Sequence, residues 1–242
     1  MAKDSIQSGC HHTDKGRDPM GRSAADEAYD AIHEMISSGS ISSGQQIVES
    51  AIAESLGMSR TPVREAIRRL QQDGLVEVIR NKGCFLKKST FTELADGYEI
   101  IAVLSAMACR HLALHQETLD PEDLSSLQEV LENMEACLPQ KRIREWVELD
   151  IRFHRLLIEM ANIWQLSNMY DNLSLCVNQV LWLVTPLFVD CSQSTRDHHT
   201  LLKLIAGGKD EEAFQFARTH HMRTVDIIQK MNALGDSIPN LY

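Results

Sequence analysis

The stretch Ser59 to Leu70, SRTPVREAIRRL, has the pattern of a helix with two unlike faces. At about 100° per residue its apolar side chains share one stripe, formed by Val63, Ala66, Ile67 and Leu70. Its polar and basic side chains collect on the opposite side, which holds Arg60, Thr61, Arg64, Arg68 and Gln71. Guanidinium groups on one helical face suit phosphate oxygens and guanine edges. Taken alone, the stretch predicts either a DNA-reading helix or a solvated basic face.

The residue types at both ends mark where this helix begins and stops. Proline is tolerated only in a first helical turn, so Pro62 places the start at Ser59 or Thr61, either of which can cap it. Gly74 follows the last apolar residue and closes the helix.

The flanking segments favour DNA binding over a bare basic face. Residues 49–56 are predicted to form a short amphipathic helix, and Gly57-Met58 makes a tight turn into the arginine helix. Residues 23–38 predict a preceding helix. Residues 75–79 and 84–86 predict a hairpin with a cationic tip. We therefore expect a winged helix-turn-helix domain over residues 23–88.

This segment resembles the DNA-binding domain of GntR-family transcription regulators. The resemblance covers residues 24–88 and rests on AYDAIHEMISSG, on ESAIAESLGMSRTPVREAIRRLQQDGLVEV and on the Asn81-Lys82-Gly83 turn. It implies that Arg60, Thr61 and Arg64 contact DNA. We add further candidate DNA contacts from the helix face and the hairpin tip, namely Arg68, Arg80, Asn81 and Lys82.

Two positions depart from the pattern of that family. Ser43 stands where a proline is common, and Ser50 stands where some members have a DNA-contacting arginine. The second departure leaves the base preference open.

The charge of the chain is unevenly distributed. The formal net charge is −10 at pH 7, but residues 1–90 carry 12 basic and 12 acidic side chains, so the excess of acid lies in residues 91–242. Because local charge governs phosphate contact, an acidic second domain is compatible with a DNA-binding first one. At 242 residues the chain is long enough for two domains with separate cores.

Other compositional features predict a cytoplasmic protein without a membrane segment. The six cysteines form no CxxC pair, which favours reduced thiols. Residues 1–22 are polar and lack the apolar run of a secretory signal, so we expect a disordered arm. Polar residues and Pro186 interrupt the apolar region 173–189, which predicts a buried helix rather than a bilayer span.

The remainder of the chain, residues 89–235, predicts a mostly α fold, an antiparallel bundle of six helices. Thr90 with Glu93 forms a capping box for the first helix, and Asp120-Pro121 starts the second. The other helices are predicted at about 141–161, 164–184, 193–206 and 210–231, the fourth ending before Pro186.

Four ionisable residues interrupt the apolar stripes of three of these helices: Asp150, His154, His198 and His221. A buried carboxylate is costly unless it is paired or binds a metal. One Asp and three His from three helices suit a divalent Zn, Ni, Mn or Fe ion. A hydrogen-bonded polar network in the core is the alternative. In the helical pattern of the sequence, His199 and His220 point away from the stripes.

Residues 90–231 also resemble the effector-binding FCD domain of the FadR group of GntR regulators, in its shorter VanR-like branch. The motifs are LDIRFHRLL, DHHTLLKLI and ARTHHMRTV. The resemblance implies that Asp150 and the three histidines hold a metal that helps to bind a small carboxylate effector. The interval from His198 to His221 is one residue longer than usual, so His199 or His220 could replace one of them.

A second departure concerns the effector. Ile101 and Ser105 stand where the first FCD helix often has an arginine and a glutamate. The effector is then less acidic than usual, or another cation such as Arg110, Arg152 or Arg196 binds it.

Together these features predict a homodimeric bacterial transcription regulator, a repressor, that binds inverted-repeat operator DNA and responds to a small-molecule effector. The apolar residues 173–183 favour dimerisation through the second domain. The alternative is a metal-dependent hydrolase or isomerase that uses the Asp/His cluster to activate water. That alternative leaves the arginine helix without a role.

Overall fold

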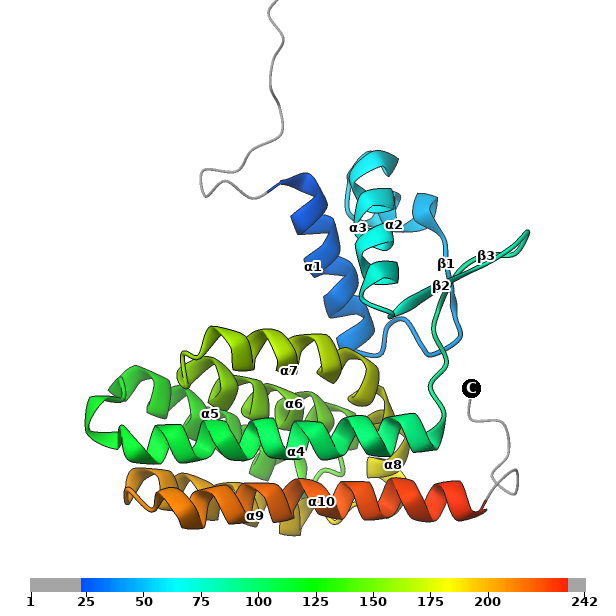
Figure 1. The fold of residues 1–242 in the computed structure, drawn as a ribbon. Coiled ribbons are helices and arrows are strands. Elements are labelled where there is room, and N and C mark those ends of the chain that lie inside the picture. The colour runs from blue at the N-terminus through cyan, green and yellow to red at the C-terminus, as the bar shows by residue number, and fades with distance from the viewer. Residues whose placement is uncertain (1–22, 235–242) are drawn as a thin grey trace, which may run out of the picture.

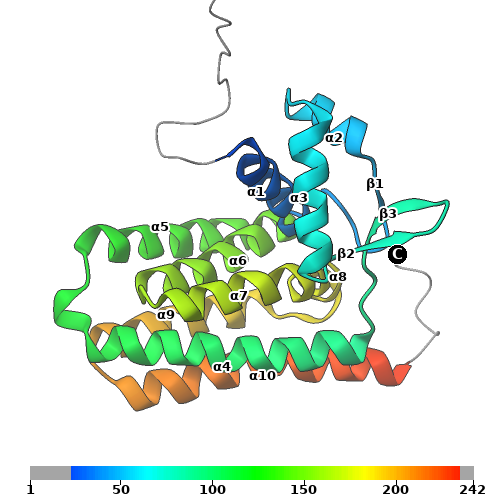
Figure 2. The same ribbon diagram turned by 45° about the horizontal axis from the view of Figure 1, so that its top comes forward.

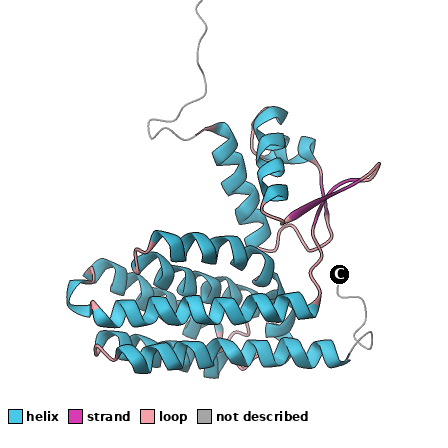
Figure 3. Ribbon diagram, in the orientation of Figure 1, coloured by secondary structure: helices cyan, strands magenta, loops and turns pink. Residues whose placement is uncertain are grey.

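The structure is a computed structural model that describes residues 23–234, so the expected arm at residues 1–22 lies outside the described residues. A small part with helices and a hairpin stands on a larger bundle of helices (Figures 1 and 3). Each part has its own hydrophobic core.

The small part is a winged helix-turn-helix, as predicted. Its helices are α1 (Ala24–Ser37), α2 (Glu49–Ser55) and α3 (Arg60–Gln72). Its strands are β1 (Gln46–Ile47), β2 (Val76–Ile79) and β3 (Gly83–Leu86), in the antiparallel order β1-β3-β2. The sequence predicted the β2–β3 hairpin but not β1, which pairs only two residues with β3.

Helix α3 has the predicted orientation. Its apolar stripe is at most 3% exposed and packs into the core of the small part: Val63, Ala66, Ile67 and Leu70. Ser59 is the N-cap residue in extended conformation, although its side chain makes no capping hydrogen bond. Pro62 lies in the first turn. Gly74, at φ 77°, turns the chain toward β2 in a conformation that glycine adopts without steric cost.

The larger part contains α4 (Phe91–Leu114), a short 3₁₀ helix (Gln116–Thr118), α5 (Pro121–Cys137) and α6 (Ile143–Met160). The chain continues with α7 (Trp164–Val177), α8 (Gln179–Phe188), α9 (Cys191–Ala206) and α10 (Asp210–Leu234). The capping box of Thr90 with Glu93 and the helix start at Pro121 are both present.

One predicted helix is divided in two. Residues 164–184 form α7 and the first part of α8, because the chain bends at the buried Asn178. The backbone N–H of Asn178 still donates to the Ser174 carbonyl at 2.8 Å. The backbone N–H of Leu181, however, donates to the Asn178 carbonyl three residues back, and α8 runs in a new direction from there. Pro186 does not end the helix, since α8 continues to Phe188.

Close packing fixes the bundle around α4. Helices α4 and α10 lie side by side in both views (Figures 1 and 2). On another face of α4, a Cβ added to Gly97 would lie 2.6 Å from Val177 Cγ1, so the missing side chain allows α7 to approach. Within the described chain, α4 is the helix long and apolar enough to cross a membrane. However, 61% of its most apolar 18-residue window is buried in the bundle.

The two parts touch through α7. Leu175 is 1% exposed and belongs to the core of the small part, where α1 packs on α7. The apolar side chains of residues 173–183 are thus largely buried against other parts of the same chain. Buried residues of that segment include Leu175, Val177, Val180 and Leu181.

Candidate functional site

The arginines of α3 lie on an exposed face. The side chains of Arg60, Arg64 and Arg68 are 63%, 65% and 65% exposed. Figure 1 shows the N-terminal end of α3 at the end of the small part that is farther from the bundle. This placement leaves the face open to a large partner.

Glu49, at the start of α2, holds two of these arginines. Its carboxylate accepts hydrogen bonds from Arg60 at 3.4 Å and from Arg64 at 3.1 Å. The hydrogen bond from Arg64 lowers the pKa of Glu49. Burial of the carboxylate opposes this effect, and the positive charge of Arg64 adds to it. Arg68 pairs instead with Glu65 at 3.2 Å. A charged carboxylate therefore orients the guanidinium groups before any DNA is bound.

The hairpin tip has a fixed backbone. Asn81 adopts φ 63°, and the Lys82 amide donates to the Ile79 carbonyl at 3.0 Å. Gln46 of β1 donates its side-chain amide to the Lys82 carbonyl at 2.8 Å. The strand that the sequence did not reveal thus supports the tip, whose three candidate DNA contacts, Arg80, Asn81 and Lys82, are all exposed.

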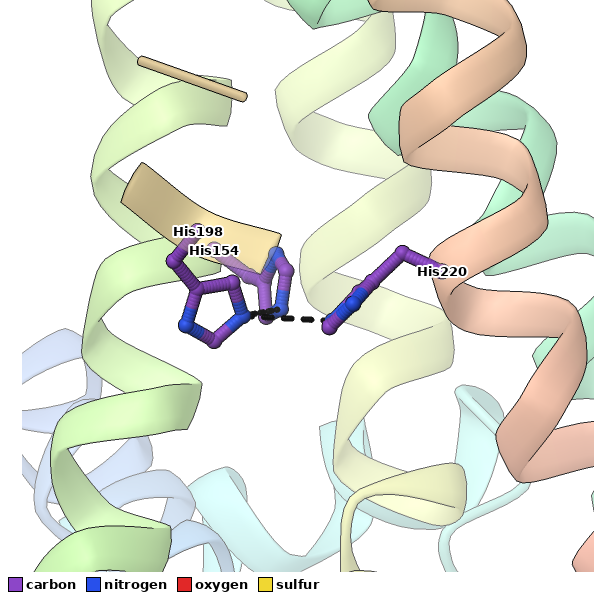
Figure 4. Close-up of side chains that lie close together, drawn as sticks. All are labelled: His154, His198 and His220. Carbon is purple, nitrogen blue, oxygen red and sulfur yellow. Dashed lines mark hydrogen bonds between the residues drawn. The ribbon is translucent and has the colours of Figure 1, made fainter. Parts of the chain in front are cut away.

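A second cluster lies in the bundle, where α6, α9 and α10 meet. His154 of α6, His198 of α9 and His220 of α10 point their rings toward one another (Figure 4). The Nε2 atom of His198 is 3.2 Å from that of His154 and 3.1 Å from that of His220. One ligand atom from each of the three lies within 4.8 Å of the other two. This spacing is compatible with a single metal ion bound by all three rings.

The two remaining predicted ligands border this triad. Asp150 Oδ1 lies 3.5 Å from His198 Nε2. The His221 ring is centred 4.4 Å from that of His154 and meets Tyr98 edge-on at 5.7 Å. Among the described side chains, neither Asp150 nor His221 is part of the group of three converging ligand atoms.

Burial gives the three histidines the protonation state that suits a metal, whereas it disfavours the charged form of Asp150. Asp150, His154, His198 and His221 are between 0% and 6% exposed. Burial raises the pKa of Asp150 to about 7 and lowers the pKa of each of the three histidines well below its usual value. Neutral imidazoles keep a lone pair for coordination. The Nδ1 atoms of His154 and His198 are buried without a hydrogen-bond partner among the described residues.

Asp197 orients His220, a contact that the helical pattern of the sequence did not predict. Its carboxylate lies 3.4 Å from His220 Nδ1, accepts from Gln193 at 2.9 Å and pairs with Arg223. Burial raises the pKa of Asp197, but the hydrogen bonds from His220 and Gln193 and the Arg223 charge lower it to about 2. A carboxylate on the outer nitrogen of a histidine is the usual support of a metal-binding imidazole.

Several residues that the sequence offered as possible metal or effector ligands lie outside this cluster. His199 faces away from it, with its Nε2 2.9 Å from Glu135. Of the cations considered for the effector, Arg110 pairs with Asp210 at 3.4 Å and Arg196 donates to Gln193 at 2.8 Å. Arg223 is the cation found beside the cluster, through its contact with Asp197.

Comparison with known families decides the identity of both parts. Residues 24–86 match the model of the bacterial regulatory proteins of the gntR family, and residues 96–223 match the FCD domain. The chain belongs to the GntR family of transcription regulators with an FCD domain. The winged helix is therefore its DNA-binding domain, and the bundle is its FCD domain.

Several relatives support this assignment. An uncharacterised HTH-type transcriptional regulator from the TAR-I ttuE-ttuC′ intergenic region of Agrobacterium vitis is 36% identical over 134 residues, covering 55% of this chain and 78% of the relative. The HTH-type transcriptional repressor RspR of Escherichia coli is 22% identical, covering 76% and 79% of the two chains. The solved structure of McbR/YncC of E. coli has the same fold, with a TM-score of 0.76 at 21% identity over 87% of this chain and 99% of that one.

These matches set aside the enzyme alternative. The families and relatives are transcription regulators and not enzymes. The four cysteines that the structure describes as free thiols are Cys84, Cys109, Cys137 and Cys191.

Proposed function

We propose that this regulator is a cytoplasmic homodimeric repressor that binds an inverted-repeat operator and responds to a small organic acid. Residues 23–88 then form the DNA-binding domain, and residues 89–235 bind the effector and dimerise. The observation that carries the proposal is the pairing of an exposed arginine face on α3 with a buried, polar Asp/His cluster in the other domain.

The DNA contacts we assign are those of α3 and the wing: Arg60, Thr61, Arg64, Arg68, Arg80, Asn81 and Lys82. Glu49 supports this assignment because it pre-orients Arg60 and Arg64. Pre-orientation reduces the side-chain entropy that is lost on binding. The repressor role draws on RspR, a relative named as a repressor.

The metal ligands we propose are Asp150, His154 and His198, completed by His220. We favour His220 over His221 because its Nε2 converges with those of His154 and His198 and because Asp197 supports its outer nitrogen. Imidazole and carboxylate together suit Zn, Ni, Mn or Fe. A bound cation would supply the positive charge that attracts a carboxylate effector.

Dimerisation is better explained by α4 than by residues 173–183, which are largely buried in the chain. Large apolar side chains on the outer face of α4 are 42% to 59% exposed: Ile100, Val103, Met107 and Leu114. A contiguous apolar stripe on a surface helix favours a partner, and two-fold pairing suits a protein that reads two half-sites. An effector that binds one dimer geometry better would shift the spacing of the DNA-binding domains.

Selection of sequences from a pool of random DNA duplexes tests this function. The full chain should enrich an inverted repeat whose half-sites are separated by about one or two helical turns. Arg60→Ala combined with Arg64→Ala should enrich no motif, whereas the control Arg196→Ala, on the outer surface of α9, should enrich the same repeat. Enrichment of a single unrepeated site, or of none by the wild type, contradicts the proposal.

A further inference from the structure

A cavity of about 320 Å³ lies between the two domains. The loop from Gly39 to Ser43 borders it on one side, the interdomain linker at Lys87 on another, and Trp182 of α8 with Arg144 of α6 on the bundle side. None of the residues of the Asp/His cluster lines it. Arg144 precedes Asp150 by six residues, or about 9 Å along the helix axis. The cavity is within the usual size range of small-molecule sites, about 300–1,000 Å³.

Its walls are mainly apolar. Leu75 and Leu86 of the DNA-binding domain and Leu94 and Leu183 of the FCD domain contribute side chains. The indole Nε1 of Trp182 is buried and has no hydrogen-bond partner among the described residues. The N–H group is thus covered by protein in this structure, and Trp182 presents its apolar ring to the cavity.

The charges at the cavity are all positive. Its lining includes Arg144 and Lys87 but no aspartate or glutamate, although the whole chain has a net charge of −10. Within the described chain, Arg144 is exposed and has no ion pair or hydrogen bond through its side chain. The Lys87 ammonium makes a long ion pair with Glu93, at 3.9 Å. Two available cations beside an apolar wall favour an anion with an apolar body.

We propose that this interdomain cavity is a second ligand site, distinct from the Asp/His cluster, that binds a small organic carboxylate with an apolar body. Arg144 and Lys87 bind the carboxylate, and the leucines and the Trp182 ring contact the apolar body. Because the lining comes from both domains and the linker, the ligand stabilises the present placement of the DNA-binding domain on the bundle. The site thus couples the occupancy of a metabolite to the geometry of DNA binding.

Titration of the full chain with sodium octanoate, in the presence of a chelator that removes divalent metal, tests this site. We expect saturable binding by calorimetry, with quenching of tryptophan fluorescence. Arg144→Gln should weaken octanoate by about tenfold, because a charge-assisted hydrogen bond is lost. Trp182→Phe should weaken it less and remove most of the quenching. The uncharged probe 1-octanol should bind weakly in both the wild type and Arg144→Gln.

Matched variants separate this site from the other one. Arg152→Gln, which removes an exposed arginine from the same helix, and His154→Ala should bind octanoate like the wild type. Equal loss in His154→Ala would place the carboxylate at the Asp/His cluster and overturn the proposal. So would the absence of saturable binding up to about 10 mM, or an affinity that Arg144→Gln and Lys87→Gln leave unchanged. None of these results depends on whether the Asp/His cluster holds a metal.

Discussion

At both proposed sites, a single carboxylate orients a side chain of a neighbouring helix. Glu49 shows this for DNA, because one carboxylate from α2 holds Arg60 and Arg64 of α3 in place. Asp197 plays the equivalent part in the bundle, where its carboxylate from α9 orients His220 of α10. In both cases a carboxylate from a neighbouring helix orients a residue that we propose as a ligand contact.

Arg64 provides the direct test at the DNA face. Arg64→Ala should weaken operator binding by about tenfold to a hundredfold if the guanidinium reads a base. If it contacts phosphate alone, operator and random DNA should weaken alike, with a smaller salt dependence. Fluorescence anisotropy at two salt concentrations separates the two roles. An unchanged affinity for both kinds of DNA would remove Arg64 from the interface.

The buried histidines predict how stability depends on pH in metal-free protein. Below their usual pKa of about 6.5, His154, His198 and His221 bind protons in the unfolded chain but stay neutral when folded. Asp150 acts in the opposite sense, since its folded pKa of about 7 makes it lose a proton on unfolding. The histidines outnumber it, so unfolding takes up protons and stability falls as the pH drops from about 6.5 to 5.

Chemical denaturation with a chelator present measures this dependence. Each net proton taken up lowers the free energy of unfolding by at most about 1.4 kcal/mol per pH unit. His115→Gln, at an exposed position, should keep the wild-type pH dependence, and His221→Phe should reduce it. A free energy of unfolding that is constant across this pH range would show that the cluster is not buried in neutral form.

At the scale of elements, the sequence predicted most of what local patterns control. The stripe of α3, the capping box of α4 and the proline start of α5 each depend on residues within one or two helical turns, and all three are present. The break at Asn178 and the strand β1 were missed, because each depends on contacts with other elements. The same limit applies to His220, whose support by Asp197 crosses between two helices.

We predict that the outer face of α4 forms the dimer interface. Met107→Glu should place a charge in an apolar contact and dissociate the dimer, because an unpaired carboxylate is costly to bury. Analytical ultracentrifugation of the full chain at tens of micromolar measures the change. Ser125→Glu introduces the same charge on the exposed face of α5 and should leave the dimer intact. A monomeric wild type, or a Met107→Glu variant that remains dimeric, would move the interface elsewhere.

At the scale of the whole molecule, a central polar cluster links three helices of the bundle. Figure 4 shows why a cation there would matter, since α6, α9 and α10 each present one imidazole to the same point. A metal held by all three would join segments that are distant in sequence. It would therefore stabilise the folded chain by mass action, in proportion to its affinity.

Elemental analysis of bound metal distinguishes a metal site from a polar network in the core. Purified full-length protein, stripped with chelator, reloaded with Zn, Ni or Mn and dialysed, should retain about one equivalent of one of these ions. His154→Ala, His198→Ala and His220→Ala should each lose it together with the gain in thermal stability, while the control His199→Ala should retain both. If His221→Ala lost the metal and His220→Ala did not, His221 would be the ligand in place of His220. If the wild type retained less than about a tenth of an equivalent of every ion, the cluster would be a buried hydrogen-bonded network and not a metal site.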